Sequence, residues 1–157
     1  ILEEKKEIRE TKVVDPGVAF IISNILADNR AREMAFGPNS ILNIPNHNIS
    51  VKTGTSDNKR DNWTIGYTPN YVVAVWVGNN NNAPMSQSLA SGITGAAPIW
   101  NKIMTNLISS STNTKIAMPD NIIQKTCLGK EEYFVKGTEN LVNCNFIPKP
   151  SGIITSN

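Results

Sequence analysis

Three strand-like segments between residues 48 and 78 constrain the fold more than any other feature of the chain. The first covers Asn48 to Thr55, the second covers Asn62 to Tyr67, and the third, Tyr71 to Gly78, is apolar on both faces. Thr68-Pro69-Asn70 is a tight connection between the last two, which predicts an antiparallel hairpin. A strand that is apolar on both faces is typical of the interior of a sheet with helices on each side.

Helical patterns flank these strands. Asp15-Pro16 predicts a helix start, because Asp is a good N-cap and Pro fits the first turn. This helix fades near Asn29, and Gly37-Pro38 ends any continuation. Its expected buried face consists of Val18, Ile21, Ile22, Ile25 and Leu26. A second helix from Thr94 to about Ser109 carries an apolar stripe of Ile99, Trp100, Ile103, Met104 and Leu107. We therefore predict an α+β fold, an antiparallel sheet covered by helices on both faces.

The size and charge of the chain limit the classes of protein to which it can belong. The chain has 157 residues, which is enough for one domain with a hydrophobic core. Its 15 basic and 13 acidic residues nearly balance, so no nucleic-acid partner is indicated. No apolar run approaches the roughly 20 residues of a membrane helix. The start at Ile1 has neither an initiator Met nor a secretory signal, so we expect a longer protein with any membrane anchor upstream.

The two ends of the chain carry weaker patterns. Residues 1–14 are dense in charge and predict a solvated hairpin or a frayed strand, and residues 148–152 resemble a linker. Cys127 and Cys144 are either two small buried thiols or one disulfide that closes a short loop in an exported protein. Together with one distant His they make a poor zinc site, and we predict no metal. We divide the chain into a domain at 1–109 and a poorly defined tail at 110–157.

The tetrapeptide Lys52-Thr53-Gly54-Thr55 closes the first strand and carries the chemistry. A strand edge can pair with an extended peptide, and Gly lets a ligand approach the backbone closely. The Lys supplies positive charge, and the Thr hydroxyls can donate to a carboxylate. A backbone N–H just after the Gly can stabilise an oxyanion, an effect worth roughly 3–4 kcal/mol. Strict alternation nevertheless places Lys52 and Gly54 on one face and both threonines on the other.

The tetrapeptide and the residues after it, VKTGTSDNKRDNWTIGYTPNYVVAVWVG, resemble the transpeptidase domain of class A penicillin-binding proteins. The similarity includes Asp28-Asn29-Arg30-Ala31-Arg32 before this run and the stretch from Gly92 to Trp100 after it. It covers about Val13 to Leu107. The resemblance implies that residues 1–109 form the C-terminal part of that domain, incomplete here because its N-terminal half lies upstream.

The resemblance also implies specific roles. Lys52 lies next to the serine of a Ser-x-Asn motif, and the Thr55 amide forms half of the oxyanion hole. Thr53, Gly54 and Thr55 bind the carboxylate of a peptidoglycan stem peptide ending in D-Ala-D-Ala, or of a β-lactam. The whole enzyme cross-links stem peptides through an acyl-serine at the extracytoplasmic face of a bacterial membrane, without a cofactor. The nucleophile and its base are expected upstream, so we predict that this chain alone is inactive.

Two other functions share these features. A serine β-lactamase has the same fold and tetrapeptide, although the Trp-rich hairpin and the tail with two Cys argue against it. A non-catalytic module could have kept the strand and lost the serine.

Several residues near the tetrapeptide favour a structural interpretation. Ser56 mimics both serine signatures, with Asn58 and with Lys59, but it falls in a polar turn that lacks the desolvation a Lys base requires. We therefore do not expect it to be the nucleophile. His47 is a loop residue without a partner at a recognisable spacing. Trp63 and Trp76 are predicted to be core residues, and Arg60-Asp61 is predicted to brace the loop by an ion pair.

Overall fold

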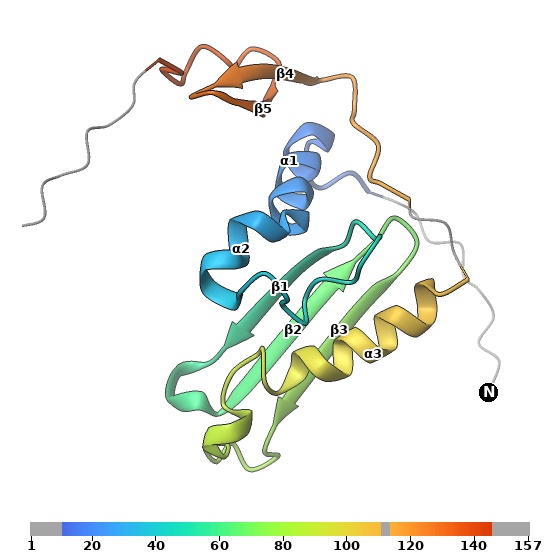
Figure 1. Cartoon of the computed structure of the whole chain (residues 1–157), viewed down its shortest axis with the longest axis vertical. Coiled ribbons are helices and arrows are strands. Elements are labelled where there is room, and N and C mark those ends of the chain that lie inside the picture. The colour runs from blue at the N-terminus through green and yellow to red at the C-terminus, as the bar shows by residue number, and fades with distance from the viewer. Residues whose placement is uncertain (1–10, 111–113, 146–157) are drawn as a thin grey trace, which may run out of the picture. The chain divides into compact units, whose positions relative to one another are not determined.

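The computed structural model describes residues 11–110 and 114–145 (Figure 1). The predictions for residues 1–10 and for the linker at 148–152 fall outside the described residues. The described residues form two compact units, one from Ile22–Ala117 and one from the described parts of Ile1–Ile21 and Met118–Asn157. The division of the chain at residue 109 stays a prediction. No helix in the described ranges is long and apolar enough to cross a membrane.

The larger unit is built on a three-stranded antiparallel sheet. Its strands β1 (Ser50–Thr55), β2 (Asp61–Tyr67) and β3 (Val72–Gly78) lie in the order β1-β2-β3. The predicted hairpin is present, because the Thr68 N–H donates to the carbonyl of Tyr71 at 2.9 Å. The three predicted strands are thus confirmed. In this sheet β2 is the central strand, however, so the expectation that the third strand is internal is wrong for the described residues.

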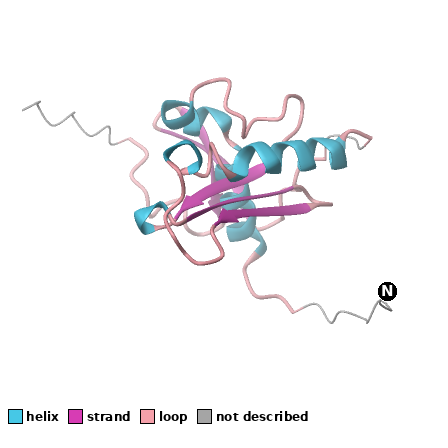
Figure 2. Cartoon of the chain, turned by 90° about the horizontal axis from the view of Figure 1, so that it is seen from below, coloured by secondary structure: helices cyan, strands magenta, loops and turns pink. Residues whose placement is uncertain are grey.

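Helix α3 (Ala96–Ile108) packs on one face of the sheet, as Figure 2 shows. Trp100 and Met104 are fully buried, whereas Ile99, Ile103 and Leu107 of the predicted stripe are largely exposed. On the strand side this face carries the buried valines Val51, Val73 and Val75 of the outer strands and small or polar residues of β2. A Cβ on Gly66 would lie 2.8 Å from Cε2 of Trp100, so the indole fills the space that a side chain would need. The core therefore joins large helix residues to a glycine of β2 and to valines of its two neighbouring strands.

The opposite face of the sheet carries the large side chains. Trp63, Ile65 and Trp76 are 43%, 43% and 41% exposed. The prediction that Trp63 and Trp76 are core residues is therefore wrong. Alternation separated the two faces of β2 correctly, but the apolar face of β2 is not the one that α3 covers.

Helix α1 (Pro16–Ala27) approaches this second face at one end only. The hydroxyls of Ser23 and Tyr67 lie 2.8 Å apart, and Ser50 Oγ donates to the Ser23 carbonyl at 2.7 Å. Both Ser23 and Ser50 are buried. Helices thus lie on both faces of the sheet, as predicted, but the second face is covered only beside Ser50 and Tyr67.

Side chains that cap helices set the boundaries before β1. Asp15 Oδ1 accepts from the N–H groups of Gly17 and Val18, which confirms the predicted helix start. Asp28 Oδ1 accepts in the same way from Arg30 and Ala31 and begins a second helix, α2 (Asn29–Phe36). The sequence did not predict α2 as a separate helix. Gly37, with φ of +75°, ends it.

The predicted buried face of α1 is wrong in part. Val18, Ile22 and Ile25 are 44%, 50% and 58% exposed, whereas Phe20 and Ser23 are buried. Apolar residues occur on most sides of this helix, so their spacing could not indicate which side is packed.

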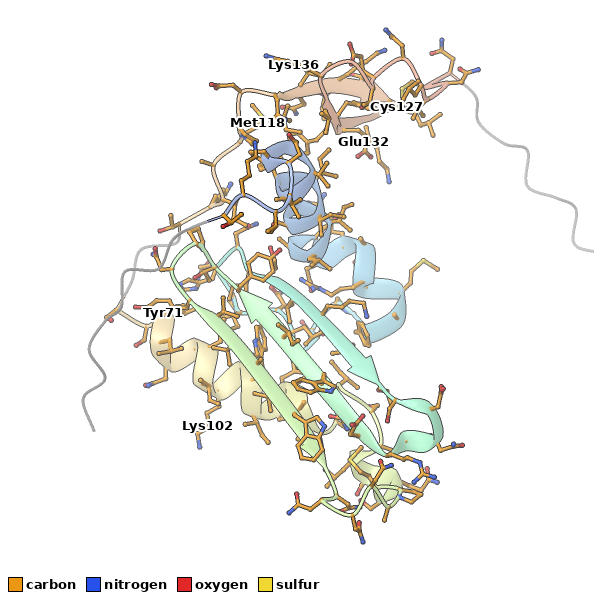
Figure 3. All side chains as sticks on the ribbon, turned by 180° about the vertical axis from the view of Figure 1, so that it is seen from behind. Tyr71, Lys102, Met118, Cys127, Glu132 and Lys136 are labelled. Atoms are coloured by element: carbon orange, nitrogen blue, oxygen red, sulfur yellow. A yellow bond between two sulfur atoms is a disulfide. The ribbon has the colours of Figure 1, made fainter. Side chains whose placement is uncertain are left out.

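The smaller unit contains a hairpin of β4 (Ile122–Cys127) and β5 (Lys130–Val135). Leu128 and Gly129 make its two-residue turn with φ of +53° and +78°, as a type I′ turn requires. A disulfide joins Cys127 to Cys144 with the Cα atoms 4.5 Å apart, and Figure 3 labels Cys127 on the hairpin. Tyr133 packs edge-on against Phe20 with ring centroids 5.1 Å apart. The sequence missed this hairpin, because charged residues interrupt its apolar pattern.

Candidate functional site

The tetrapeptide lies on β1, which has a strand neighbour on one side only. The register pairs Lys52 with Ile65 and Gly54 with Trp63 on the sparsely covered face. Thr53 and Thr55 instead point to the face that α3 covers. The separation predicted by alternation is present, so the four residues share an edge of the sheet rather than a face.

The backbone of β1 directs alternate residues to that outer edge. The Ser56 N–H donates to the Asp61 carbonyl at 3.1 Å, so even-numbered residues of this strand bond across to β2. The Val51 carbonyl points the other way and accepts from Arg32 at 3.2 Å. By the same alternation Thr53 and Thr55 direct their N–H and C=O groups outward. This is the geometry that a strand needs in order to pair with an extended ligand.

The amine of Lys52 reaches the same edge. Lys52 is exposed, and its Nζ donates to the Thr53 carbonyl at 2.6 Å. The side chain of Lys52 leaves the strand on the sparsely covered face of the sheet, but it is flexible and brings its charge to the outer edge of β1. A positive charge therefore lies beside the backbone groups that an anionic ligand would meet.

Gly92, in the loop before α3, packs against the two threonines. Its N–H donates to Thr55 Oγ1 at 3.2 Å, and a Cβ at this position would lie 2.8 Å from Thr53 Cβ. The loop can approach β1 so closely only because residue 92 has no side chain. The Thr55 hydroxyl that accepts this bond keeps its own proton for donation to a ligand. The family resemblance includes Gly92, in the stretch from Gly92 to Trp100, but the sequence assigned no role to this residue.

Asn62 holds the same loop from β2. Its Oδ1 accepts from the Ala96 N–H at 2.9 Å, and its Nδ2 donates to the Leu89 carbonyl at 2.7 Å. Leu89 ends the short helix η2 (Gln87–Leu89), and Ala96 begins α3. Asn62 is fully buried, so both bonds form in a region of low dielectric constant. Asn62 therefore caps α3 from a neighbouring strand, a role that sequence spacing could not show.

A cavity of about 230 Å³ opens along the outer edge of β1 and reaches Lys52 and Thr53. Apolar side chains of α1, α2, Leu42 and Val51 line most of it, and Asp28, Arg32 and Lys52 contribute charged groups. Burial lowers the pKa of Arg32, while the charge of Asp28 acts in the opposite direction. The candidate site thus combines a backbone edge, an exposed ammonium group and an apolar recess.

Residues after the tetrapeptide close the loop between β1 and β2. Ser56 Oγ accepts from the Asp61 N–H at 3.0 Å, and Lys59 Nζ donates to Gln87 Oε1 at 3.3 Å. The two side chains that mimic the serine signature therefore have separate partners. His47 is also in a loop, with Nδ1 3.0 Å from the Pro45 carbonyl. Among the described residues no three His, Cys, Asp or Glu side chains gather as metal ligands.

The predicted ion pair between Arg60 and Asp61 is wrong. Arg60 donates to the Asn82 carbonyl, and Asp61 Oδ2 accepts from the Trp76 indole at 3.0 Å. The bond from Trp76, followed by that from Ser56, lowers the pKa of Asp61. Arg60 precedes β2 with helical backbone angles, and each of the two side chains has a different partner.

Comparisons with known proteins lead to the same family that the sequence resembles. Penicillin-binding protein 1A of Clostridium botulinum is 31% identical over 123 residues, covering 78% of this chain and 14% of that protein. Penicillin-binding protein 1C of Escherichia coli is 33% identical over 114 residues, covering 71% of this chain and 14% of that protein. The resemblance to penicillin-binding proteins is confirmed. No protein-family model matches the chain.

A solved structure supports the fold of this penicillin-binding-protein segment. The crystal structure of penicillin-binding protein 1A from Haemophilus influenzae superposes with a TM-score of 0.73 at 24% identity, covering 86% of this chain and 22% of that chain. The predicted α+β, transpeptidase-like fold, incomplete in this chain, is thereby confirmed. The chain spans only about a seventh of the curated relatives, 14% of the Clostridium botulinum protein.

Proposed function

We propose that this chain supplies the substrate-pairing edge of a peptidoglycan D,D-transpeptidase that works through an acyl-serine intermediate. The outer edge of β1 carries this proposal, because Thr53 and Thr55 direct their backbone groups outward and the Lys52 amine lies at the Thr53 carbonyl, 2.6 Å away. An extended stem peptide pairs with this edge as an added strand.

The roles follow from where each group lies. The Thr55 N–H donates to the oxyanion that forms when a serine attacks the penultimate carbonyl, and one such donor is worth roughly 3–4 kcal/mol. The hydroxyls of Thr53 and Thr55 bind the terminal carboxylate, and Gly54 admits the ligand close to the backbone. D-Ala then leaves, and the acyl group passes from the serine to the amine of a second stem peptide.

The nucleophile and its base come from an upstream half of the same protein, which is the first partner of this chain. The sparsely covered face of the sheet supports this, because Trp63, Ile65 and Trp76 expose apolar area beside the tetrapeptide. Contiguous apolar area of this kind is typical of an interaction surface. With the upstream half in place, Lys52 lies next to the serine of the Ser-x-Asn motif.

The protein acts at the extracytoplasmic face of a bacterial membrane, with its anchor upstream of this chain. The disulfide between Cys127 and Cys144 supports this location, because disulfides persist mainly in oxidising compartments. β-Lactams act as ligands that trap the serine, and no cofactor takes part.

Intact mass after incubation with benzylpenicillin tests the proposal. We expect one stoichiometric adduct on a protein that joins this chain to its upstream half, and none on the chain alone. Slow loss of that adduct is expected of a transpeptidase, whereas rapid turnover would indicate a serine β-lactamase. An adduct on the chain alone that disappears in Ser56→Ala would contradict our assignment of the nucleophile.

A further inference from the structure

Arg32 connects the helices to β1 just before the tetrapeptide begins. Its Nη1 donates to the carbonyls of Leu26 at 3.1 Å and of Val51 at 3.2 Å. Its Nη2 lies 3.5 Å from the Ala27 carbonyl, so one guanidinium serves the C-terminal end of α1 and the edge of β1 together. The side chain is half-buried, and its Nε donates to Asn29 Oδ1 at 3.2 Å, which fixes the orientation of the fork.

The Val51 carbonyl, which accepts a hydrogen bond from Arg32, is the first of the backbone groups that β1 directs to its outer edge. Val51, Thr53 and Thr55 face that edge in turn, because the pairing direction alternates along a strand. An extended ligand could in principle pair with any two neighbours of this series. A slip by two residues keeps every ligand side chain on its original face, so the side-chain pattern alone does not prevent it.

Such a slip would move the ligand away from the catalytic groups. Two residues of a strand correspond to roughly 7 Å. A carbonyl displaced by that distance no longer meets the Thr55 N–H, and the bound ligand is unproductive. A group that already donates a hydrogen bond to the Val51 carbonyl prevents the ligand from pairing in this displaced register.

We propose that Arg32 is a positioning residue that ends the pairing edge of β1 at Val51 and thereby restricts an extended ligand to Thr53 and Thr55. The inference rests on the proposed function and adds to it the residue that sets the ligand register. A Lys at this position offers one compact ammonium group and cannot reproduce the fork that reaches Leu26, Ala27 and Val51.

Two ligands of different length test this role in a protein that carries the chain together with its upstream half. Benzylpenicillin is short and needs only the groups from Thr53 onward, whereas an N-acylated pentapeptide ending in D-Ala-D-Ala extends along the edge. We expect Arg32→Ala to lower kcat and KM for the peptide together, each about tenfold, the factor that follows when the unproductive register is favoured by about 1.4 kcal/mol. Their ratio kcat/KM should change little, because unproductive binding lowers both constants by the same factor. The rate of acylation by benzylpenicillin should change less than about twofold.

Matched variants separate positioning from folding. Arg32→Lys keeps the charge and should recover only part of the peptide activity. Arg30→Ala removes an exposed Arg from the same helix and should change neither rate. Equal losses for both ligands would reduce Arg32 to a structural role and overturn the inference, as would no loss for either. Absence of acylation in the unmodified protein would instead refute the proposed function, so the two failures are distinguishable.

Discussion

The two sides of β2, the central strand of the sheet, differ in the side chains that they present and in how far these are buried. Under α3, β2 presents Asn62, Thr64 and Gly66 between buried valines of β1 and β3, and the helix packs Trp100 and Met104 into this core. The other face presents Trp63, Ile65 and Trp76, which are each more than 40% exposed. On the central strand β2 the polar side is therefore the buried one, and the aromatic side is the open one.

This difference shows that burial depends on the partner of a face rather than on its own polarity. Asn62 and Thr64 can be buried because α3 and its preceding loop satisfy their polar atoms. The aromatic face has cover only near Ser50 and Tyr67, where α1 contacts it. A large apolar face that stays open is typical of an interaction surface, and the upstream half is the partner that we propose for it.

The largest expected effect is at Trp100, on the covered face. Trp100→Ala should lower the free energy of unfolding by about 4 kcal/mol, because it leaves a cavity under a fully buried indole. Trp63→Ala on the open face should cost less than about 1.5 kcal/mol in the same chain. Urea denaturation measures both.

The same pair gives a sharper test when the upstream half is present. If that half covers the open face, Trp63→Ala should then cost about as much as Trp100→Ala. An equal cost of the two substitutions in the chain alone would break the contrast between the faces.

Two glycines give the next largest contrast. Gly66→Ala places a Cβ 2.8 Å from Cε2 of Trp100 and should destabilise the chain by about 2–3 kcal/mol. Gly54→Ala adds a Cβ whose nearest contact is the Trp63 Cβ at 3.9 Å, and it should cost less than about 1 kcal/mol. A thermal denaturation series compares them, and similar losses for the two would contradict the assignment of faces.

Asn62 tests the polar part of the covered face. Asn62→Ala removes the acceptor of the Ala96 N–H and the donor to the Leu89 carbonyl, so we expect a loss of about 2 kcal/mol. Asn62→Asp keeps the acceptor at α3 and loses the donor. Hydrogen exchange at the Ala96 amide should therefore accelerate in the Ala variant but change less in the Asp variant.

The smallest effect is at Asp61, on the open side. The bond from Trp76, and next that from Ser56, lowers the pKa of Asp61 in the folded chain. Stability from this group is therefore present above the unfolded pKa, near 3.9, and is lost as pH falls through the lower folded value. The indole resonance of Trp76 should shift over that acid range, and Asp61→Asn should abolish the shift. A shift that persists in Asp61→Asn would assign it to another carboxylate.

Much of the fold could be predicted from local patterns. Asp15-Pro16, Gly37 and Thr68-Pro69-Asn70 marked boundaries by their own conformational preferences, and the strand alternation separated Lys52 from Thr53 correctly. The tetrapeptide identified the candidate site for the same reason, because its residue types carry the chemistry. The hairpin of β4 and β5 escaped prediction because charged residues interrupt its apolar pattern, and its disulfide and the contact of Tyr133 with Phe20 join residues far apart in the sequence.

The sequence by itself determined the three strands of the sheet and their hairpin, since these depend on neighbours along the chain, and it supplied the residues that we propose to bind a carboxylate. Only the tertiary structure decided which face of the sheet is buried, and it alone gave roles to Arg32, Gly92 and Asn62. Each of these three acts across the fold, on Val51, Thr55 and Ala96. Contacts between residues 19, 37 and 34 positions apart leave no periodic trace in the sequence, because their partners are fixed only when the elements pack.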